Sequence, residues 1–224
     1  VERIADEAKP KQIYTIGTAG GATLKDNLGD VVVTNSGHAQ LTLSHNKKAE
    51  CNNKTITGSW FPEFNQIATI EEKMFIPLSE VLTDNEWDSL LKEYQKKNSG
   101  TSSMTLDELI NAPLKRSNIS SPMAKIEKGN PLLTTDYYYI SSPEGNNDYS
   151  ILEMDDTVVG YAAQKKNIDF LFVRNVSDTV VVGEAGGQQL TKSQREGWSS
   201  VIYEKCGLYT SVNGALTTWS AITG

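Results

Sequence analysis

The sequence is poor in cysteine and histidine, with two residues of each. Two cysteines, Cys51 and Cys206, do not make a disulfide framework, so we expect two reduced thiols. His38 and His45 lie in no paired-histidine or H-E-x-x-H pattern, and the sequence predicts neither a bound metal nor a cofactor. No apolar run approaches the roughly 18 residues of a membrane-spanning helix. Since no secretory segment is visible either, we expect a cytoplasmic protein without a membrane partner.

Basic residues are fewer than acidic ones, with 21 Lys and Arg against 28 Asp and Glu and a formal net charge of −7. Nucleic-acid backbones are bound by clustered basic side chains, so this balance argues against nucleic acid as the main partner. A small anionic ligand stays compatible, because a few backbone N–H groups can hold one. At 224 residues, 38% of them hydrophobic, the chain is long enough for one domain with a sizeable core.

Strand-like and helix-like segments alternate through most of the chain. Runs of β-forming residues predict strands at 12–16, 30–34, 137–140 and 169–176, a short strand within 50–70 and another at 73–78. Capping boxes at Thr83 and Thr105, together with apolar residues at helical spacing, predict helices at 83–97, 105–111, 151–166 and 193–222, the last with a weak point at Asn213-Gly214. Loops are predicted at 115–132 and 183–187. This order is typical of an α/β fold with a mostly parallel sheet and helices on its faces.

Three segments carry residue types suited to binding or catalysis. Gly17-Thr18-Ala19-Gly20-Gly21 ends the first strand, where glycines let backbone approach a ligand, and a tight structural turn is the plainer interpretation. Glu153-Met154-Asp155-Asp156 opens a predicted helix, where acidic side chains complement the helix dipole or accept hydrogen bonds from sugar hydroxyls. Ser177 and Asp178 follow the most apolar strand, at the edge where open α/β sheets bind ligands, although an Asp there also serves turns and caps.

In this order and spacing, the three segments resemble the nucleoside phosphorylase superfamily, which includes methylthioadenosine/adenosylhomocysteine nucleosidases, purine nucleoside phosphorylases and AMP nucleosidases. Residues 152–155 are similar to the family's Val-Glu-Met-Glu, residues 174–178 to its Arg-x-Ile-Ser-Asp, and residues 135–138 to its Gly-Asp-x-Phe. The resemblance covers 12–35 and 134–180. It implies a three-layer α/β fold, with a central mixed, mostly parallel sheet and helices on both faces. Residues 1–224 would form one domain, with an insertion relative to the family at about 50–132. Because residues 1–11 alone precede the glycine-rich strand, we expect the family's N-terminal strands to be missing, as in a fragment, a pared-down fold or a fold completed by a second polypeptide.

The resemblance implies cleavage of the N-glycosidic bond of a purine nucleoside or nucleotide. Asp178 would give a proton to the departing base, which requires a raised pKa such as burial provides, and Ser177 would orient Asp178. Tyr138, or Tyr137 if the register slips by one, would stack on the base. Asp155, one methylene shorter than the family's Glu, would bind the ribose hydroxyls. The other expected substrate contacts are Glu153, Met154 and the backbone of Thr18, Ala19 and Gly20.

The nucleophile and even the presence of catalysis stay open at this point. Thr15 stands where phosphorylases of the family often carry an Arg that clamps phosphate, which favours water, with phosphate and a phosphorolytic enzyme as the alternative. The change at Asp155 and the short N-terminal segment keep a non-catalytic nucleoside-binding or storage protein open, and an unrelated α/β domain is a further alternative. Members of the family are dimers, trimers or hexamers, so the resemblance also implies a homo-oligomer.

Overall fold

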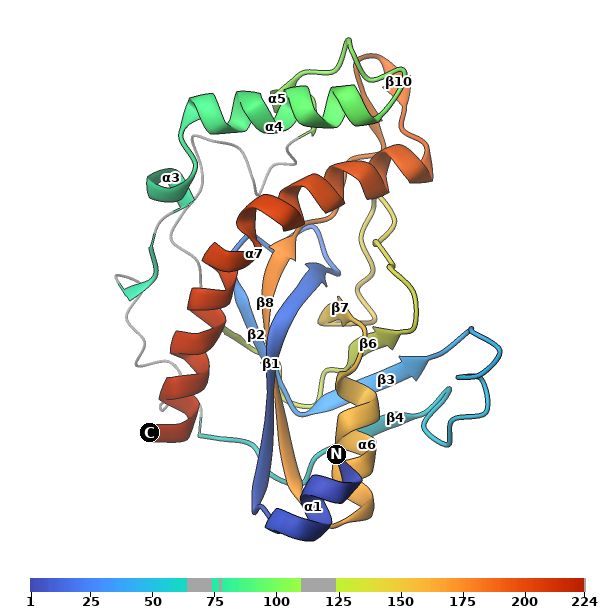
Figure 1. Ribbon diagram of the computed structural model, residues 1–224, viewed down its shortest axis with the longest axis vertical. Helices are drawn as coiled ribbons and strands as arrows, with labels where there is room; N and C mark the ends of the chain where they lie inside the picture. Colours follow the sequence, from blue (N-terminus) through green and yellow to red (C-terminus); the bar gives the residue numbers. More distant parts are fainter. Residues whose placement is uncertain (64–73, 77, 110–123, 224) are drawn as a thin grey trace.

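The computed structural model describes residues 1–63, 74–76, 78–109 and 124–223 (Figure 1). Ten strands lie among them: β1 (Gln12–Gly21), β2 (Val31–Thr34), β3 (Ser36–Gln40), β4 (Thr55–Thr57), β5 (Ala124–Ile126), β6 (Leu132–Thr135), β7 (Ile151–Glu153), β8 (Asp169–Asp178), β9 (Glu184–Ala185) and β10 (Gln188–Gln189). The helices are α1 (Glu2–Ala8), α3 (Leu78–Val81), α4 (Asp84–Lys97), α5 (Leu106–Leu109), α6 (Asp156–Lys165) and α7 (Lys192–Thr223).

Eight of these strands form one sheet, in the order β4-β3-β6-β7-β1-β8-β2-β5, while β9 and β10 pair with each other. Four of the seven neighbouring pairs in the described sheet are parallel: β1–β8, β2–β5, β3–β6 and β6–β7. Strands β1 and β8 are paired over most of their length, from Gln12 beside Asp169 to Gly20 beside Asp178. The predicted α/β fold with a mixed, mostly parallel sheet is confirmed.

Strand β8 explains why the sheet carries a helix on each face. Successive side chains of a strand point to opposite faces, and every residue of β8 from Phe170 onward is buried. Phe170 and Phe172 belong to the same core cluster as Ala163 of α6, whereas Leu171 and Val173 cluster with Ala221 of α7. The C-terminal half of α7 runs beside the sheet (Figure 1), so a single apolar strand holds the two helical layers together.

The N-terminal half of α7 packs against α4 and α5 in a separate core. Helix α4 begins at the predicted capping box, in which Glu86 accepts from the Thr83 amide at 2.7 Å and Thr83 Oγ1 accepts from the Glu86 amide at 3.4 Å. Its apolar face is then buried against α7, where Tyr94 meets Trp198 edge to face at 5.2 Å. At the second predicted box, Glu108 accepts from the Thr105 amide and from Thr105 Oγ1, both at 2.8 Å. Residues 110 and 111 of that prediction lie outside the described part of the chain.

Two predicted elements beside the later site are wrong. Residues 137–140 form no strand, because β6 ends at Thr135 and the tyrosines that follow lie in a loop. Residues 151–166 are not one helix, since 151–153 form β7 and α6 begins at Asp156. The physical reason is Glu153, whose carboxylate accepts the backbone N–H groups of Asp155 and Asp156 and so ends the strand where the helix starts.

Other differences concern short elements with weak sequence signals. Strand β3 was not predicted, and the predicted loop at 115–132 contains β5 and the start of β6, while 115–123 lie outside the described residues. Residues 74–76 of the strand predicted at 73–78 are not extended into a sheet, and α3 starts at Leu78. The predicted loop at 183–187 includes β9.

Helix α7 shows no break at Asn213-Gly214. The Asn213 side chain donates to Gly29 O at 3.0 Å, and Thr217 Oγ1 donates to Asn213 O at 3.0 Å, so the polar groups of this turn are engaged while the helix continues. No helix in the described part of the chain is both long enough and apolar enough to cross a membrane.

Candidate active site

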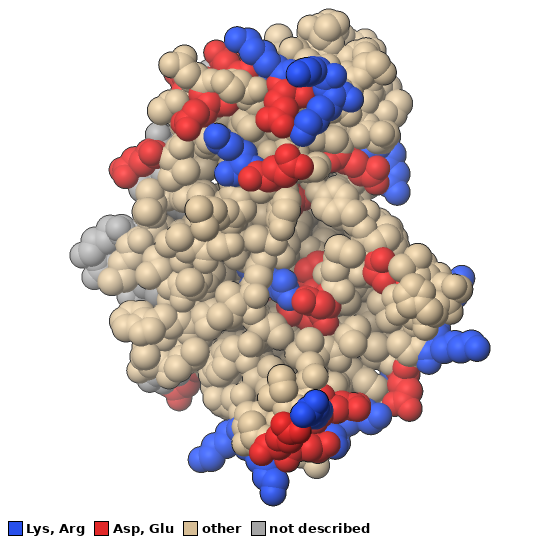
Figure 2. All heavy atoms as spheres, viewed as in Figure 1, with Lys and Arg blue, Asp and Glu red and all other residues tan. Residues whose placement is uncertain are grey.

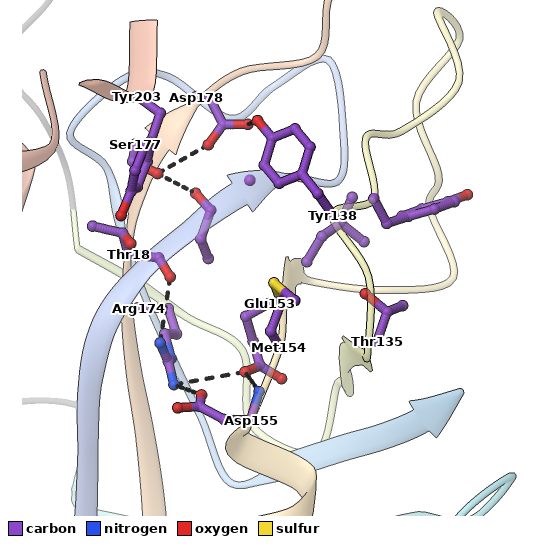
Figure 3. A pocket seen from close by; sticks show the side chains of 14 residues that line it. Thr18, Thr135, Tyr138, Glu153, Met154, Asp155, Arg174, Ser177, Asp178 and Tyr203 are labelled. Atoms are coloured by element: carbon purple, nitrogen blue, oxygen red, sulfur yellow. Dashed lines mark hydrogen bonds and ion pairs between the residues drawn. The ribbon is translucent and has the colours of Figure 1, made fainter. Parts of the chain in front are cut away.

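A cavity of about 400 Å³ opens at the carboxyl ends of β1 and β8 (Figure 3). This is the edge at which ligands of open α/β sheets bind, and the volume is that of a small-molecule site. All nine residues that the sequence singled out line it: Thr18, Ala19, Gly20, Tyr138, Glu153, Met154, Asp155, Ser177 and Asp178. The lining also contains residues that the sequence had not assigned to the site, namely Thr135, Tyr139, Leu152, Arg174 and Tyr203, the last of which was expected in the core or a subunit contact.

The glycine-rich segment is extended rather than turned, which corrects the prediction of a turn after residue 16. Residues 17–21 continue β1, and the missing side chains make room for their neighbours on β8. A Cβ on Gly17 would lie 2.3 Å from Arg174 Nη1, and one on Gly20 would lie 3.2 Å from Asp178 Oδ2. Glycine is therefore needed here for close approach to the site's own charged groups.

A β-bulge sets the direction of the residues at the end of β8. The register between β1 and β8 shifts after Ala19, so that Ala19 faces Val176 and Gly20 faces Asp178, with Ser177 as the additional residue. Ser177 Oγ donates to Ala19 O at 3.2 Å and to Asp178 Oδ1 at 2.9 Å. The predicted orienting contact between Ser177 and Asp178 is thus present in the geometry.

Asp178 is a buried carboxyl group on the cavity wall. Besides Ser177, it accepts from Ser199 Oγ of α7 at 2.5 Å and from the Tyr138 hydroxyl at 3.3 Å, both at Oδ2. Burial raises the pKa of Asp178 above its ordinary value, although these hydrogen bonds oppose the rise. A raised pKa is the direction that a carboxylic acid needs in order to hold a proton near neutrality.

The register of the tyrosines is decided by the loop after β6. Tyr138 turns its hydroxyl toward Asp178, as Figure 3 shows, whereas Tyr137 packs edge to face on Tyr139 at 5.9 Å. Asp136 points elsewhere and accepts the amides of Thr42 and Leu43. Of the two tyrosines left open by the sequence, Tyr138 is therefore the one in the cavity.

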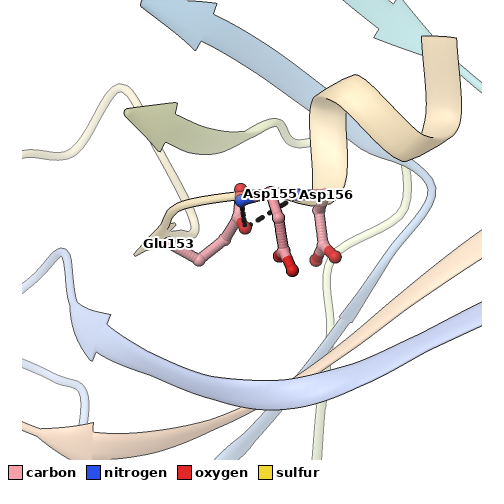
Figure 4. Close-up of side chains that lie close together, drawn as sticks. All are labelled: Glu153, Asp155 and Asp156. Carbon is pink, nitrogen blue, oxygen red and sulfur yellow. Dashed lines mark hydrogen bonds between the residues drawn. The ribbon is translucent and has the colours of Figure 1, made fainter. Parts of the chain in front are cut away.

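The acidic segment 153–156 lies where β7 passes into α6 (Figure 4), and Glu153, Met154 and Asp155 of it line the cavity. Glu153 is buried, accepts from Thr134 Oγ1, and receives the amides of Asp155 and Asp156 at 2.5 and 2.8 Å. Burial, followed by repulsion from Asp156, raises the pKa of Glu153 well above its ordinary value. Both oxygens of Glu153 are thus engaged by the protein, and this side chain shapes the wall.

Arg174 balances the charge of this acidic segment. Its Nε donates to Asp156 Oδ2 at 2.7 Å, its Nη2 contacts both Asp155 and Asp156, and its Nη1 donates to Thr18 O at 3.3 Å. The three carboxylates of Glu153, Asp155 and Asp156 each offer an oxygen within 4.8 Å of the others. Arg174 places one positive charge among these three acidic groups.

The side chains of Met154 and Asp155 line the cavity and stay largely exposed. The Asp155 side chain is 68% exposed despite its ion pair with Arg174, and Met154 is 53% exposed. On the face drawn in Figure 2, charged side chains gather over α4 and over α1, and a small group of acidic and basic atoms lies near the middle. The site therefore combines an acidic wall, an apolar methionine and an aromatic side.

Solved structures share this architecture at low sequence identity. A 5′-methylthioadenosine/S-adenosylhomocysteine nucleosidase of Helicobacter pylori, in complex with butyl-thio-DADMe-Immucillin-A, has a TM-score of 0.50 at 11% identity, covering 99% of this chain and 72% of its own. A futalosine hydrolase mutant of the same organism has a TM-score of 0.50 at 12% identity over 99% and 72%. The chain has the nucleoside phosphorylase fold.

A third structure with this fold is a Borrelia burgdorferi protein that carries the provisional name of the same methylthioadenosine/adenosylhomocysteine nucleosidase and is bound to adenine. Its TM-score is 0.51 at 12% identity, over 98% of this chain and 72% of its own. No protein-family model and no curated protein sequence matches the chain. Identities this low show the fold that these proteins share, and leave activity to be argued from the site.

Sequence reasoning missed two residues that organise the site within this fold. Arg174 had a detectable signal, because an arginine inside the most apolar strand needs buried acidic partners. Ser199 had none, since it is one of several serines on a long helix and its contact with Asp178 spans 21 positions.

Proposed function

We propose that this protein hydrolyses the N-glycosidic bond of a purine nucleoside or nucleotide. The observation that carries the proposal is Asp178, a buried carboxyl group with a raised pKa that faces a nucleoside-sized cavity from the end of a central strand. The fold supports it too, because the H. pylori structures are a nucleosidase and a futalosine hydrolase, and the Borrelia structure holds adenine.

In the proposed reaction, protonated Asp178 gives its proton to N7 of the purine. The O–H bond of Asp178 breaks as the N–H bond forms, and the electron pair of the glycosidic bond leaves with the base. A neutral base is a better leaving group than a purine anion, which is the contribution of a general acid. Water then adds to the electron-poor sugar carbon and loses a proton. Met154 and Asp155 lie on the wall where the sugar would bind.

Water is favoured over phosphate by the charge of the cavity. Among the lining residues that the structure describes, Arg174 is the one cationic side chain, and it is already bound by Asp155 and Asp156. Phosphate would enter beside carboxylates with no uncommitted guanidinium or ammonium group to receive it, and like charges in a poorly solvated site repel strongly. This geometry adds to the argument from Thr15, which replaces the phosphate-clamping Arg expected of a phosphorylase.

The test is base release from purine nucleosides, 5′-methylthioadenosine among them, in phosphate-free buffer. We expect free base and free sugar from the wild type, and a loss of about 10²–10⁴-fold in kcat for Asp178→Asn, with binding measured by calorimetry largely kept. Asp107→Asn, at an exposed position of α5, is the matched control and should behave as wild type. Base release that requires phosphate and yields ribose 1-phosphate would identify a phosphorylase instead.

A non-catalytic nucleoside-binding or storage protein is the second candidate, and one observation favours it. Asp155, the residue proposed to hold the ribose hydroxyls, is paired with Arg174, which weakens its capacity to grip the sugar. This candidate predicts that wild type and Asp178→Asn bind a purine nucleoside alike and that neither releases base.

A homo-oligomer is also proposed from the resemblance. Large apolar side chains lie exposed on the outer side of α7, and Leu208, Trp219 and Ile222 are 84%, 62% and 60% exposed. The same helix buries small polar residues such as Thr210 and Thr217 against the sheet. Exposed apolar surface of this kind is typical of a subunit contact. Sedimentation velocity should show a species larger than 24.6 kDa, and Trp219→Glu should shift it toward the monomer, whereas Ile4→Glu on α1 should not.

A further inference from the structure

Three side chains form a continuous hydrogen-bonded chain that ends at the proposed acid. The Tyr138 hydroxyl lies 2.5 Å from Ser199 Oγ, and Ser199 Oγ lies 2.5 Å from Asp178 Oδ2. Both hydroxyls can donate or accept. The direct contact of the Tyr138 hydroxyl with Asp178 Oδ2, at 3.3 Å, is longer than either link. With Asp178 ionised, the shorter bonds run from Tyr138 to Ser199 to Asp178, and with Asp178 protonated they run in the reverse direction. The chain is therefore satisfied in both protonation states of the acid.

The two ends of this chain differ in their access to water. Asp178 and Ser199 are 4% and 1% exposed, whereas Tyr138 is 42% exposed. Tyr138 also borders a second cavity of about 610 Å³, lined among others by Ser193, Gly197 and Ser200 of α7. The motif that residues 135–138 resemble has a phenylalanine at this position, so the hydroxyl of Tyr138 is an additional group here.

A substrate in the first cavity would separate Asp178 from the water of that cavity. After the base has taken its proton, Asp178 is left as a carboxylate in a buried place, and burial penalises that form. The second cavity meets the first at Tyr138 and Tyr203, and its other lining residues take no part in the first. It offers a source of protons that bound substrate or product does not block.

We propose that Tyr138 and Ser199 are a proton relay that recharges Asp178 from the second cavity after each release of base. This rests on the proposed function, since it takes Asp178 as the acid. In one relay event a hydronium proton binds the Tyr138 oxygen, the phenolic proton moves to Ser199 Oγ, and the Ser199 proton moves to Asp178 Oδ2. The event consumes one solvent proton, which balances the proton lost by the attacking water, and leaves both hydroxyls neutral.

The experiment compares two rates in the same protein. Single-turnover base release, with enzyme in excess, uses the proton already on Asp178, whereas steady-state release needs the relay in every cycle. For Ser199→Ala and for Tyr138→Phe, which keeps the ring, we expect steady-state kcat to fall by about 10-fold or more beyond any fall in the single-turnover rate. Ser199→Thr, which keeps a hydroxyl, should restore the ratio, and Ser200→Ala, at the second cavity, is the matched control.

The double variant separates a relay from independent structural effects. Two links of one chain do not add, so Tyr138→Phe/Ser199→Ala should have the steady-state kcat of the worse single variant. Additive losses, or single variants whose two rates fall equally, would overturn the relay while leaving Asp178 as the acid. A wild type that releases no base would instead overturn the proposed function, and the relay with it. Thermal unfolding of each variant shows whether it is folded. If Ser199→Ala is not, the two rates are compared for Ser199→Thr instead.

Discussion

Replacing Arg174 with Met is expected to destabilise the fold by about 3–5 kcal/mol near pH 8, the cost typical of removing one partner of a buried ion pair. Methionine fills much of the space of the arginine stem, so the loss isolates the charge. The guanidinium group is held between Asp155 and Asp156, 3.6 Å from Glu153, with a side chain that is 9% exposed. Since small domains are stable by about 5–15 kcal/mol, this single change is a large share of the total.

The pH dependence of the loss follows from the two buried carboxyls. Burial raises the folded-state pKa of Glu153 and of Asp156, and Arg174 lowers both. A carboxyl whose pKa is raised by folding binds its proton more tightly in the native state. Its contribution to stability is therefore fully present below the unfolded pKa of about 4 and is lost as pH rises through the folded value. Without Arg174 both folded values rise further, so the variant's deficit should be small near pH 5 and large near pH 8.

Urea unfolding at about pH 5 and about pH 8, followed by circular dichroism, measures the free energy of unfolding at both ends of this window. Lys165→Met, which removes the exposed ion pair between Lys165 and Glu50, is the matched control and should change stability little at either pH. A deficit for Arg174→Met below about 1 kcal/mol near pH 8, or one that grows toward pH 5, would refute the assignment of Arg174 as the neutralising charge.

Two further predictions test the geometry of the site and the core. Gly20→Ala places a Cβ 3.2 Å from Asp178 Oδ2, so the carboxyl must move by a few tenths of an ångström; we expect kcat to fall about 10-fold while KM changes little, measured by steady-state base release. The thiols of Cys51 and Cys206 are buried, and burial raises the pKa of Cys206 to about 12, so Ellman's reagent should label neither in the folded protein and both in urea.

The parts of the fold that could be predicted are those with strong local signals. Strand β8 is a continuous apolar run, and α4 starts at a capping box followed by apolar residues at helical spacing, so their positions follow from local chemistry. Strand β3 contains Ser36, Gly37 and His38, which have little tendency to form strands, and it exists because it pairs between β4 and β6. That pairing is a tertiary property which no window of sequence contains.

The loop tyrosines show that a strong strand propensity can also occur where no strand forms. Residues 137–140 are strong β-formers, yet the chain uses their rings to border the cavity and to pack on each other. Their propensity reflects aromatic bulk, which serves a binding site as well as a strand. Most of the candidate site could be predicted from the sequence because its motifs lie at the ends of strands. Ser199 could not, because the packing of α7 on β8 brings it to Asp178.

The orientation of the proposed acid depends on one surplus residue. Ser177 is the position at which β8 carries one residue more than β1, between Val176 opposite Ala19 and Asp178 opposite Gly20. Deleting that single codon would leave the aspartate opposite Gly20, but would take away the hydroxyl that binds Ala19 O and Asp178 Oδ1. A chain with this deletion would keep its acid and lose the side chain that holds the carboxyl in one orientation.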